Sequence, residues 1–520
     1  MALVCLDEVA ERFRRRGASL FPYQVEAARR VVEDMGGSGI LADEVGLGKT
    51  VEAGLVILEL ARRERVRDVL VLVPASLTYQ WRRELAEKFG LAARARLEAG
   101  GLVVASLDTA KRGAAAEACL GRAWDLLLVD EAHRLKNPRT QVHRFTAALR
   151  RRHTVLISAT PLQNDLTELH ALVSLVRPEL FGGFEEFQRR FLLDRRTPRD
   201  PAALRALLER VMVRHRRGDF LPAFPRRHVR MVPVDPTPEE RELYEAVTEA
   251  VRAEYWRRVV DGGSVLPLIA LQREACSSPA ALRATLERMG DGDWRRRHGH
   301  LWTLAAAARN PAKALALTQL VRRIEGKVLV YTEFRATQED IVARLRADGV
   351  PVAAFHGGLT AAAKDEALHA FAQRARVLVS TECGGEGLNL QFCRHLVNYD
   401  LPWNPMRVEQ RIGRVHRLGQ AEDVWVYNLY VRDTIEEALL DLLHEKIDLF
   451  RQVVGELDVI LRQLERKRSF ERTILHIALS ARDRRELEAR FAQLGEQMVE
   501  AGRRAGAGVP EPAGLGGGRS

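Results

Sequence analysis

Residues 43–50 read Asp-Glu-Val-Gly-Leu-Gly-Lys-Thr and stand directly before a helix-like run. Glycines let backbone N–H groups turn toward phosphate oxygens, and the N-terminus of the following helix adds a partial positive charge. Lys49 can reach the β- and γ-phosphates of a nucleotide, and the Thr50 hydroxyl can hold Mg²⁺. The general pattern expects glycine at Asp43, so a glycine turn before a surface lysine is the alternative. The chain has 81 lysines and arginines, of which only nine are lysines, and a lysine kept here favours a phosphate ligand.

An acidic pair ends a second apolar run and strengthens this interpretation. Residues 124–129 predict a buried parallel strand, and Asp130 and Glu131 follow it, at the end where open α/β sheets bind ligands. Asp130 can hold Mg²⁺ directly or through water, and Glu131 can polarise an attacking water. A helix N-cap role for Asp130 is the alternative. A charged pair at the end of a buried strand is costly unless it binds something, which favours the metal site.

Composition limits the class of protein. At 520 residues, the chain is long enough for two or three domains, and 46% hydrophobic and 29% charged residues are typical of a soluble globular protein. No run approaches the ~18 apolar residues of a membrane span, and the N-terminus does not resemble a secretion signal. The five cysteines include no Cys-x-x-Cys pair, which argues against a zinc site or a disulfide framework. We therefore expect a cytoplasmic, nucleoid-associated protein with no membrane partner.

The charge balance points to a polyanionic partner. The net charge is +11, with a sequence pI of about 9.7. Residues 189–230 hold thirteen arginines against four acidic residues, nearly the whole excess. This segment is either a surface that tracks phosphates or a solvated face enriched in arginine by genome base composition. The candidate nucleic-acid contacts within it are Arg214, Arg216 and Arg217.

Alternating apolar strands and amphipathic segments predict two α/β lobes. The first set of strands is expected at residues 39–42, 69–74, 102–106, 126–129 and 154–158, and the second at 327–331, 352–355, 376–380, 395–399 and 424–427. Between them the alternation fails, and arginine-rich, helix-like stretches take over. The predicted domains are a first lobe at 1–176, a helical insertion at 177–311, a second lobe at 312–432 and C-terminal helices at 433–500. A Gly/Ala/Pro-rich tail at 501–520 is expected to be disordered.

Two further patterns lie in the last third of the chain. A capping box formed by Thr434 and Glu437 starts a long predicted helix, whose apolar stripe indicates packing. Upstream, Arg414 and Arg417 are three residues apart, which places them on one face of a helix. Two arginines held close together need an anion, and the predicted nucleotide site lies in the first lobe. We therefore interpret Arg414 and Arg417 as arginine fingers that act across an interlobe cleft. A pair of surface salt bridges is the alternative.

Eight motifs occur in an order that resembles the SWI/SNF-type branch of helicase superfamily two ATPases. They span roughly Phe21 to Tyr430, at residues 21–24, 43–50, 74–81, 130–133, 158–164, 355–358, 380–391 and 410–420. Asp43 belongs to the family's version of the phosphate loop. Glu44 and Val45, with residues 52–55, are similar to the bacterial branch that includes the RNA-polymerase-associated translocase.

The resemblance implies two RecA-like lobes and an ATP hydrolase that uses ATP and Mg²⁺ to step along double-stranded DNA. It implies catalytic roles for Lys49, Asp130, Glu131, Arg414 and Arg417. It assigns the nucleotide to Gln24, Asp43, Gly46, Gly48, Lys49, Thr50, Glu386 and Gln410, and Mg²⁺ to Thr50 and Asp130. Coupling is expected from His133, Ser158, Ala159 and Thr160, and backbone contacts from Ser76, Ser106, Ser380 and Thr381.

Three functions stay open. The first is a double-stranded-DNA translocase that remodels or displaces bound protein without obligatory strand separation. The second is a helicase that separates DNA or RNA strands, and the third is a nucleotide-gated clamp that holds DNA without productive turnover. RNA polymerase or a multi-subunit DNA-processing complex is a possible protein partner in each case.

Overall fold

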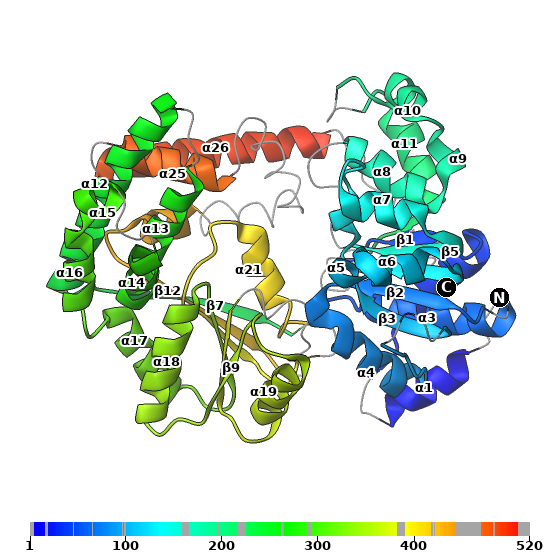
Figure 1. Cartoon of the computed structure of the whole chain (residues 1–520), viewed down its shortest axis with the longest axis horizontal. Coiled ribbons are helices and arrows are strands. Elements are labelled where there is room, and N and C mark those ends of the chain that lie inside the picture. Colours follow the sequence, from blue (N-terminus) through cyan, green and yellow to red (C-terminus); the bar gives the residue numbers. More distant parts are fainter. Residues whose placement is uncertain are drawn as a thin grey trace, which may run out of the picture. The chain divides into compact units, whose positions relative to one another are not determined.

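The computed structural model describes residues 5–15, 19–44, 46–64, 66–95, 97, 100–158, 166–194, 198–215, 225–261, 265–288, 293–381, 390–417, 420, 422–442, 470–481 and 484–507. It divides into two compact units. Unit 1 comprises Met1–Val232, Ala314–Asp400 and Arg407–Leu429, and unit 2 comprises Pro233–Lys313, Leu401–Met406 and Tyr430–Ser520. Figure 1 labels the helices and strands of each.

A six-stranded sheet with the order β3-β2-β4-β5-β1-β6 forms the first lobe of unit 1, and its pairs are all parallel. Its strands are β1 (Gly39–Leu41), β2 (Val69–Val73), β3 (Leu102–Ser106), β4 (Ala123–Val129), β5 (Arg150–Ile157) and β6 (Met212–Val213). Helices accompany them at α1 (Leu6–Arg14), α2 (Pro22–Arg29), α3 (Lys49–Arg63), α4 (Thr78–Phe89), α5 (Leu107–Ala110), α6 (Gly113–Leu120), α7 (Gln141–Ala148), α8 (Leu166–Val176), α9 (Pro178–Phe181), α10 (Phe184–Phe191) and α11 (Pro201–Glu209).

Helices cover both faces of this sheet, which explains why its strands are continuous apolar runs. Along β2, Val69, Val71 and Val73 pack into the core formed with α1 to α4. Leu70 and Leu72 pack into the opposite core, formed with α6, α7, α8, α10 and α11. Successive side chains of a strand point to opposite faces, so the all-apolar sequence of β2 fills two cores at once.

One glycine sets how closely two of these helices approach. A Cβ atom added at Gly54 of α3 would lie 2.3 Å from the ring of Phe89, the last residue of α4. Gly54 thereby lets the Phe89 ring pack directly against the α3 backbone. That contact fixes the helix that begins at Lys49.

The second sheet of unit 1 also has six strands, in the order β7-β12-β11-β8-β10-β9. They are β7 (Arg227–Val234), β8 (Val328–Thr332), β9 (Val352–Phe355), β10 (Val377–Thr381), β11 (His395–Asn398) and β12 (Val424–Val431). The helices α17 (Ala312–Arg323) and α18 (Arg335–Ala347) pack into one core and α19 (Ala361–Gln373) and α21 (Pro405–Ile412) into the other. Two parallel, helix-flanked sheets confirm the predicted fold class.

The predicted strands are present, and two further strands occur where the alternation fails. Within residues 177–311, β6 joins the first sheet and β7 joins the second. β6 has only two residues, too few for a periodic signal. β7 is mostly half-buried or exposed and carries Arg227 and Arg230, so its sequence lacks the apolar run that identifies a buried strand.

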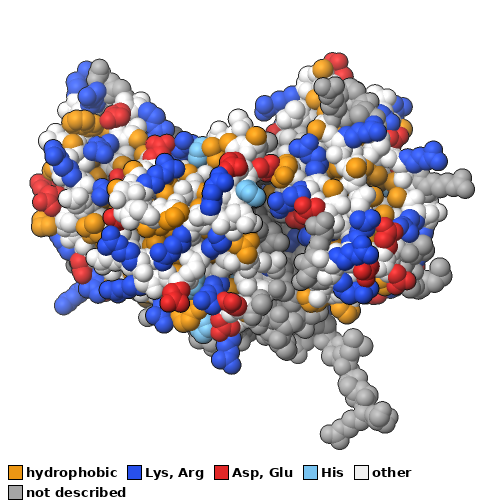
Figure 2. Space-filling model, turned by 90° about the horizontal axis from the view of Figure 1, so that it is seen from below, with side chains coloured by type: hydrophobic (Ala, Val, Ile, Leu, Met, Phe, Trp, Pro, Cys, Tyr) orange, Lys and Arg blue, Asp and Glu red, His pale blue; other side chains and the backbone are white. Residues whose placement is uncertain are grey.

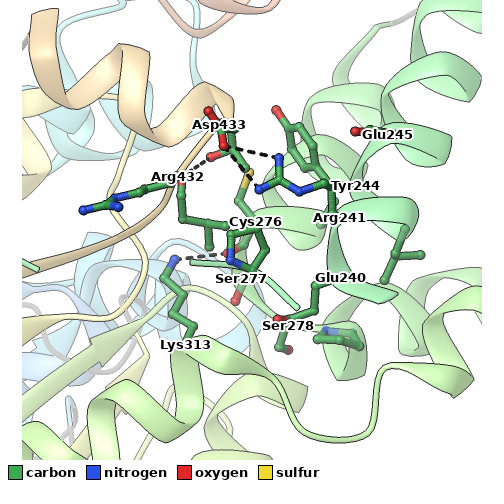
Figure 3. A pocket seen from close by; sticks show the side chains of 16 residues that line it. Glu240, Arg241, Tyr244, Glu245, Cys276, Ser277, Ser278, Lys313, Arg432 and Asp433 are labelled. Atoms are coloured by element: carbon green, nitrogen blue, oxygen red, sulfur yellow. Dashed lines mark hydrogen bonds and ion pairs between the residues drawn. The ribbon is translucent and has the colours of Figure 1, made fainter. Parts of the chain in front are cut away.

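Unit 2 is helical. It contains α12 (Pro238–Asp261), α13 (Leu266–Ser277), α14 (Pro279–Arg288), α15 (Asp293–His298), α16 (His300–Ala307), α22 (Ile435–Leu442), α25 (Phe470–Ser480) and α26 (Arg484–Ala507). A buried ion pair lies at its centre: Lys313 Nζ donates to both Glu436 oxygens at 2.8 and 2.9 Å and to Cys276 O at 3.1 Å. Figure 3 shows Lys313 beside a cavity of about 80 Å³, with Arg241 and Asp433 paired on its wall.

The pH dependence of unit 2 stability offers a first test. Glu274 of α13 is 5% exposed, and burial raises its pKa to about 7, although the Thr285 hydroxyl and the Arg288 charge act to lower it. Between about pH 4.5 and 7 the folded chain keeps a proton that the unfolded chain releases, so stability falls as pH rises. We expect Glu274→Gln to remove this loss and to gain about 2 kcal/mol more at pH 8 than at pH 5.

Urea unfolding of the full chain at the two pH values measures this difference. Glu287→Gln, on the exposed side of the neighbouring helix α14, is the control and should show no such change. An equal gain at both pH values would contradict the buried, protonated state of Glu274.

The structure of the C-terminal segments agrees in part with what the sequence predicts. Thr434 precedes α22, where its hydroxyl accepts from Glu436 N at 3.2 Å, while Glu437 accepts from Asp433 N at 3.0 Å. The rest of the long predicted helix, from residue 443 to 454, lies outside the described residues. α26 continues to Ala507, so the start of the predicted disordered tail is helical, as the good helix formers Arg503, Arg504 and Ala505 allow. Among the described residues, no helix is long and apolar enough to cross a membrane.

Candidate phosphate loop and acidic pair

The loop between β1 and α3 has the backbone of a phosphate cradle. Gly46 and Gly48 have φ angles of 93° and 91°, which residues with a side chain rarely adopt. A Cβ atom at Gly48 would lie 2.5 Å from Gln24 Nε2, so the neighbouring helix α2 also requires glycine there. α3 begins at Lys49, and Thr50 therefore lies in its first turn. Val45 lies outside the described residues.

Backbone carbonyl groups of the same loop hold the Lys49 side chain in place. Its ammonium donates to Asp43 O at 2.6 Å and to Glu44 O at 3.2 Å. Burial lowers the pKa of Lys49, and the charges of Glu52, Glu131, Asp43 and Asp130 oppose that shift. The lysine of the loop and the acidic pair after β4 thus share one electrostatic environment, which the sequence predicted only as two separate motifs.

Asp130 follows β4 with both carboxylate oxygens engaged. Oδ2 accepts from Trp81 Nε1 at 2.9 Å, and Oδ1 accepts from Glu131 N at 2.8 Å. Burial and the charge of Glu131 raise the pKa of Asp130 to about 6. Trp81, on α4, is buried; the sequence comparison placed it in a motif but did not indicate that it orients the carboxylate.

Glu131 has a left-handed backbone, with φ at 51°. Such a conformation costs a non-glycine residue about 1–3 kcal/mol and occurs most often at functional sites. His133 Nδ1 lies 3.2 Å from Glu131 Oε2. Burial acts to raise the pKa of Glu131, but the neighbouring His133, Lys49 and Arg414 lower it.

Gln24 is engaged by the protein rather than turned toward solvent. Its Nε2 donates to Leu47 O at 2.9 Å, and its Oε1 accepts from Phe21 N at 3.2 Å. The Tyr23 hydroxyl also donates to Leu47 O. These contacts tie α2 to the phosphate loop, a role for Gln24 in addition to the predicted one.

The arginines of the second lobe are not arranged as the spacing predicted. α21 ends at Ile412, and Arg414 lies in the turns that follow Gly413, so the two arginines do not share a helical face. Arg414 is buried and its carbonyl accepts from Leu390 N, whereas Arg417 is half-buried and its Nε donates to Gly413 O at 2.6 Å.

A third arginine of this segment, Arg411, is hydrogen-bonded to buried groups of the second lobe. Arg411 Nη1 donates to Asp400 O at 2.6 Å and to Asn398 Oδ1 at 3.2 Å, and its guanidinium lies 5.2 Å from the centre of the Tyr331 ring. Arg411 is 3% exposed and anchors the end of α21. Gln410, beside it, is exposed.

The remaining predicted residues are distributed as follows. Ser158 follows β5 and its N donates to Leu41 O at 3.0 Å, and Ser106 ends β3 at the same edge of the sheet. Ser380 and Thr381 are buried in β10, and Ser380 Oγ donates to Thr381 O. Ser76 lies in the turn Ala75–Leu77, and Arg214 is exposed.

Some residues of the predicted site lie outside the described residues, namely Ala159, Thr160, Arg216, Arg217 and Glu386. On the face drawn in Figure 2, lysines and arginines are interspersed with acidic side chains rather than gathered in a single patch.

Two family models match the chain. The SNF2-related domain matches residues 23–281, and the helicase conserved C-terminal domain matches residues 312–419. The first covers the phosphate loop and the acidic pair, and the second covers Arg414 and Arg417.

Curated relatives agree with these models, and a solved structure also matches the chain. The chain is 42% identical over 456 residues to the uncharacterized ATP-dependent helicase YqhH of Bacillus subtilis, covering 85% of this chain and 81% of that protein. It is 30% identical over 502 residues to the RNA polymerase-associated protein RapA of Pectobacterium atrosepticum, covering 83% of this chain and 50% of that one. The chain thus spans half the length of RapA. The SWI2/SNF2 ATPase core of Sulfolobus solfataricus in complex with dsDNA matches at 22% identity, with a TM-score of 0.39, over 86% of this chain and 95% of that one.

Proposed function

Because the chain belongs to the SNF2-related family of ATP-dependent helicase-like enzymes, we propose that it couples ATP hydrolysis to movement along double-stranded DNA. The movement remodels or displaces bound protein without obligatory strand separation. One observation supports the ATP-dependent part most directly. The phosphate loop and the Asp130–Glu131 pair follow β1 and β4 at the carboxyl edge of one parallel sheet, where Lys49 lies within electrostatic reach of both acids.

The residues of the first lobe fit a nucleotide with its magnesium. The backbone of Gly46 and Gly48 forms the cradle, and Lys49 supplies a compact positive charge. Thr50 and Asp130 would hold Mg²⁺, which when bound neutralises charge on the phosphate oxygens. Glu131 orients the attacking water and takes its proton, held in position by its left-handed backbone and by His133.

The second lobe completes the proposed mechanism. Arg414 and Arg417 stabilise the charge on the transferring phosphoryl group, and release of the cleaved phosphate removes the anion that they contact. Ser158 lies at the end of β5, between the phosphate loop and the acidic pair. Together with Ala159 and Thr160, it couples ATP hydrolysis to the residues that contact nucleic acid. The proposed contacts to the DNA backbone are Ser76, Ser106, Ser380, Thr381, Arg214, Arg216 and Arg217.

Two assays separate this proposal from its alternatives. ATP turnover is measured with duplex DNA, single-stranded DNA and RNA, and triplex displacement is measured beside fork unwinding. Displacement of the third strand from an intact duplex supports translocation. Unwound forks with undisturbed triplexes would instead support a strand-separating helicase, the function that the name of YqhH states for that protein. Turnover unaffected by any nucleic acid would favour the clamp.

The RapA relatives are named for RNA polymerase, and a protein partner of that class is part of the proposal. Purification of the untagged chain from its host, with the captured proteins identified, tests it.

The hydrogen bond between Trp81 and Asp130 gives a specific prediction. Trp81→Phe keeps most of the apolar area but removes the Nε1 donor from the carboxylate. Partners that orient a metal ligand typically contribute 10- to 100-fold to metal affinity, so we expect the Mg²⁺ concentration for half-maximal turnover to rise by about tenfold or more. Trp124→Phe is the matched control, because that buried Trp donates to Cys119 O, away from the acids. Equal Mg²⁺ requirements in both variants would remove this role from Trp81.

A further inference from the structure

Asp43, the residue that stands where a phosphate loop usually has glycine, is fully buried and has a specific partner. His215 N donates to Asp43 Oδ1 at 2.9 Å, and His215 Nδ1 lies 2.9 and 3.1 Å from the two carboxylate oxygens. Because an ionised carboxylate only accepts hydrogen bonds, Nδ1 is the nitrogen that carries the proton. Asp43 and His215 are thus joined by both the backbone and the side chain of the histidine.

The same histidine extends the pairing of β1 and β6 into the phosphate loop. Ile40 N and Ala42 N donate to Val211 O and Val213 O at 2.7 and 2.8 Å, and Glu44 N continues the series by donating to His215 O at 3.2 Å. The start of the loop is therefore hydrogen-bonded to the segment that follows β6. The pairing of the two-residue strand β6 with β1 at the sheet edge places His215 beside the loop.

The imidazole ring also reaches the middle of the loop through an aromatic neighbour. The rings of His215 and Tyr23 meet edge to face, with centroids 5.4 Å apart, and the Tyr23 hydroxyl donates to Leu47 O. His215 consequently restrains the loop at Asp43 and Glu44 directly, and at Leu47 through Tyr23. Burial raises the pKa of Tyr23, so its hydroxyl keeps the proton that it donates.

These restraints converge on Lys49. The two carbonyl oxygens that accept from the Lys49 ammonium belong to Asp43 and Glu44, the residues that His215 anchors. If those carbonyls moved, the ammonium would move with them. Small displacements of a group that must meet a reacting phosphate are costly, and a misplacement of about 1 Å can cost about 100-fold in rate.

We propose that His215 is a positioning residue, which sets the shape of the phosphate loop and the position of Lys49 by holding the Asp43 carboxylate and the Glu44 amide. Its neighbour Arg214 is exposed and begins the arginine cluster assigned above to DNA. DNA bound at Arg214 would act on the residue next to His215, and this adjacency is the route by which we expect DNA to affect the loop. This inference rests on the proposed function for ATP as the ligand and for DNA as the activator.

The test compares His215→Ala, His215→Asn and the unchanged full-length chain. Three quantities are measured: the Kd of a fluorescent ADP analogue, kcat and KM for ATP with and without duplex DNA, and the midpoint of thermal unfolding. For His215→Ala we expect the Kd to rise and kcat to fall by about 10- to 100-fold, with less stimulation by DNA. His215→Asn keeps a side-chain N–H donor for Asp43 and should recover most of both losses.

His153→Ala is the matched control. His153 is a buried histidine of the same lobe, and its Nε2 lies 3.1 Å from Glu64 Oε2, a pairing remote from the phosphate loop. It should lower the unfolding midpoint while leaving nucleotide affinity and basal turnover unchanged.

Three results would overturn the inference: nucleotide affinity and turnover of His215→Ala equal to those of the unchanged chain, losses matched by the control, or no recovery in the asparagine variant. Absence of ATP turnover in the unchanged chain with every nucleic acid is a different result. It would reject the proposed function, while the ADP-binding arm would still decide the role of His215.

Discussion

Lys49→Ala is expected to abolish ATP hydrolysis, with turnover falling by about 10²- to 10³-fold or more and nucleotide affinity weakened as well. The loop holds this ammonium through Asp43 O and Glu44 O, and its removal takes away a positive charge that compensates Glu131 and Asp130. Both the binding and the chemical step lose an interaction. Initial rates of phosphate release with saturating duplex DNA, together with nucleotide titration, measure the two losses.

Lys88→Ala is the control for this variant. Lys88 pairs with Glu84 at 2.9 Å on α4 of the same lobe and serves neither the loop nor the acidic pair. We expect its turnover to match that of the unchanged chain. Normal hydrolysis by Lys49→Ala would remove the nucleotide from this loop altogether.

Arg414→Ala is expected to bind ATP with near-normal affinity and to lose about 10³- to 10⁵-fold in turnover, which corresponds to roughly 4–7 kcal/mol. An arginine that meets the phosphoryl group only during its transfer contributes little to ground-state binding, so its loss appears in kcat. Single-turnover hydrolysis beside nucleotide titration separates the two quantities.

Arg411→Ala is the informative comparison for that variant. The Arg411 guanidinium is committed to Asn398 Oδ1 and Asp400 O in a buried position, so its removal leaves polar groups unpaired and should lower the unfolding midpoint. If Arg414→Ala loses nucleotide binding together with stability, Arg414 has a structural role like that of Arg411. Its assignment as an arginine finger is then wrong.

The sequence was sufficient for the strands and loops whose pattern lies in consecutive residues. Continuous apolar runs identified strands such as β2 and β10 because both faces of each sheet are covered, and the glycines, lysine and threonine of the loop carry their chemistry within a few residues. Asp130 and Glu131 were predicted by their place after such a run.

Other features depended on contacts that no local pattern encodes. β6 is too short to have a period, yet it places His215 beside Asp43, 172 positions away in the chain. Trp81 is an ordinary buried aromatic by sequence, and only the fold directs its Nε1 toward Asp130. The spacing of Arg414 and Arg417 predicted a shared helical face, and the end of α21 at Ile412 removed it. Short-range spacing therefore predicted which strands and loops are present, but not how side chains distant in the sequence meet.

The left-handed backbone at Glu131 has a consequence for how such a chain evolves. Selection for folding alone would place glycine at this position, since glycine adopts that conformation without steric strain. In the proposed mechanism, the Glu131 carboxylate keeps the molecule less stable than its fold permits so that the group is aimed at the attacking water. Descendants that no longer hydrolyse ATP would be free to replace Glu131, and loss of the left-handed backbone at this position would mark a lineage that has lost the proposed activity.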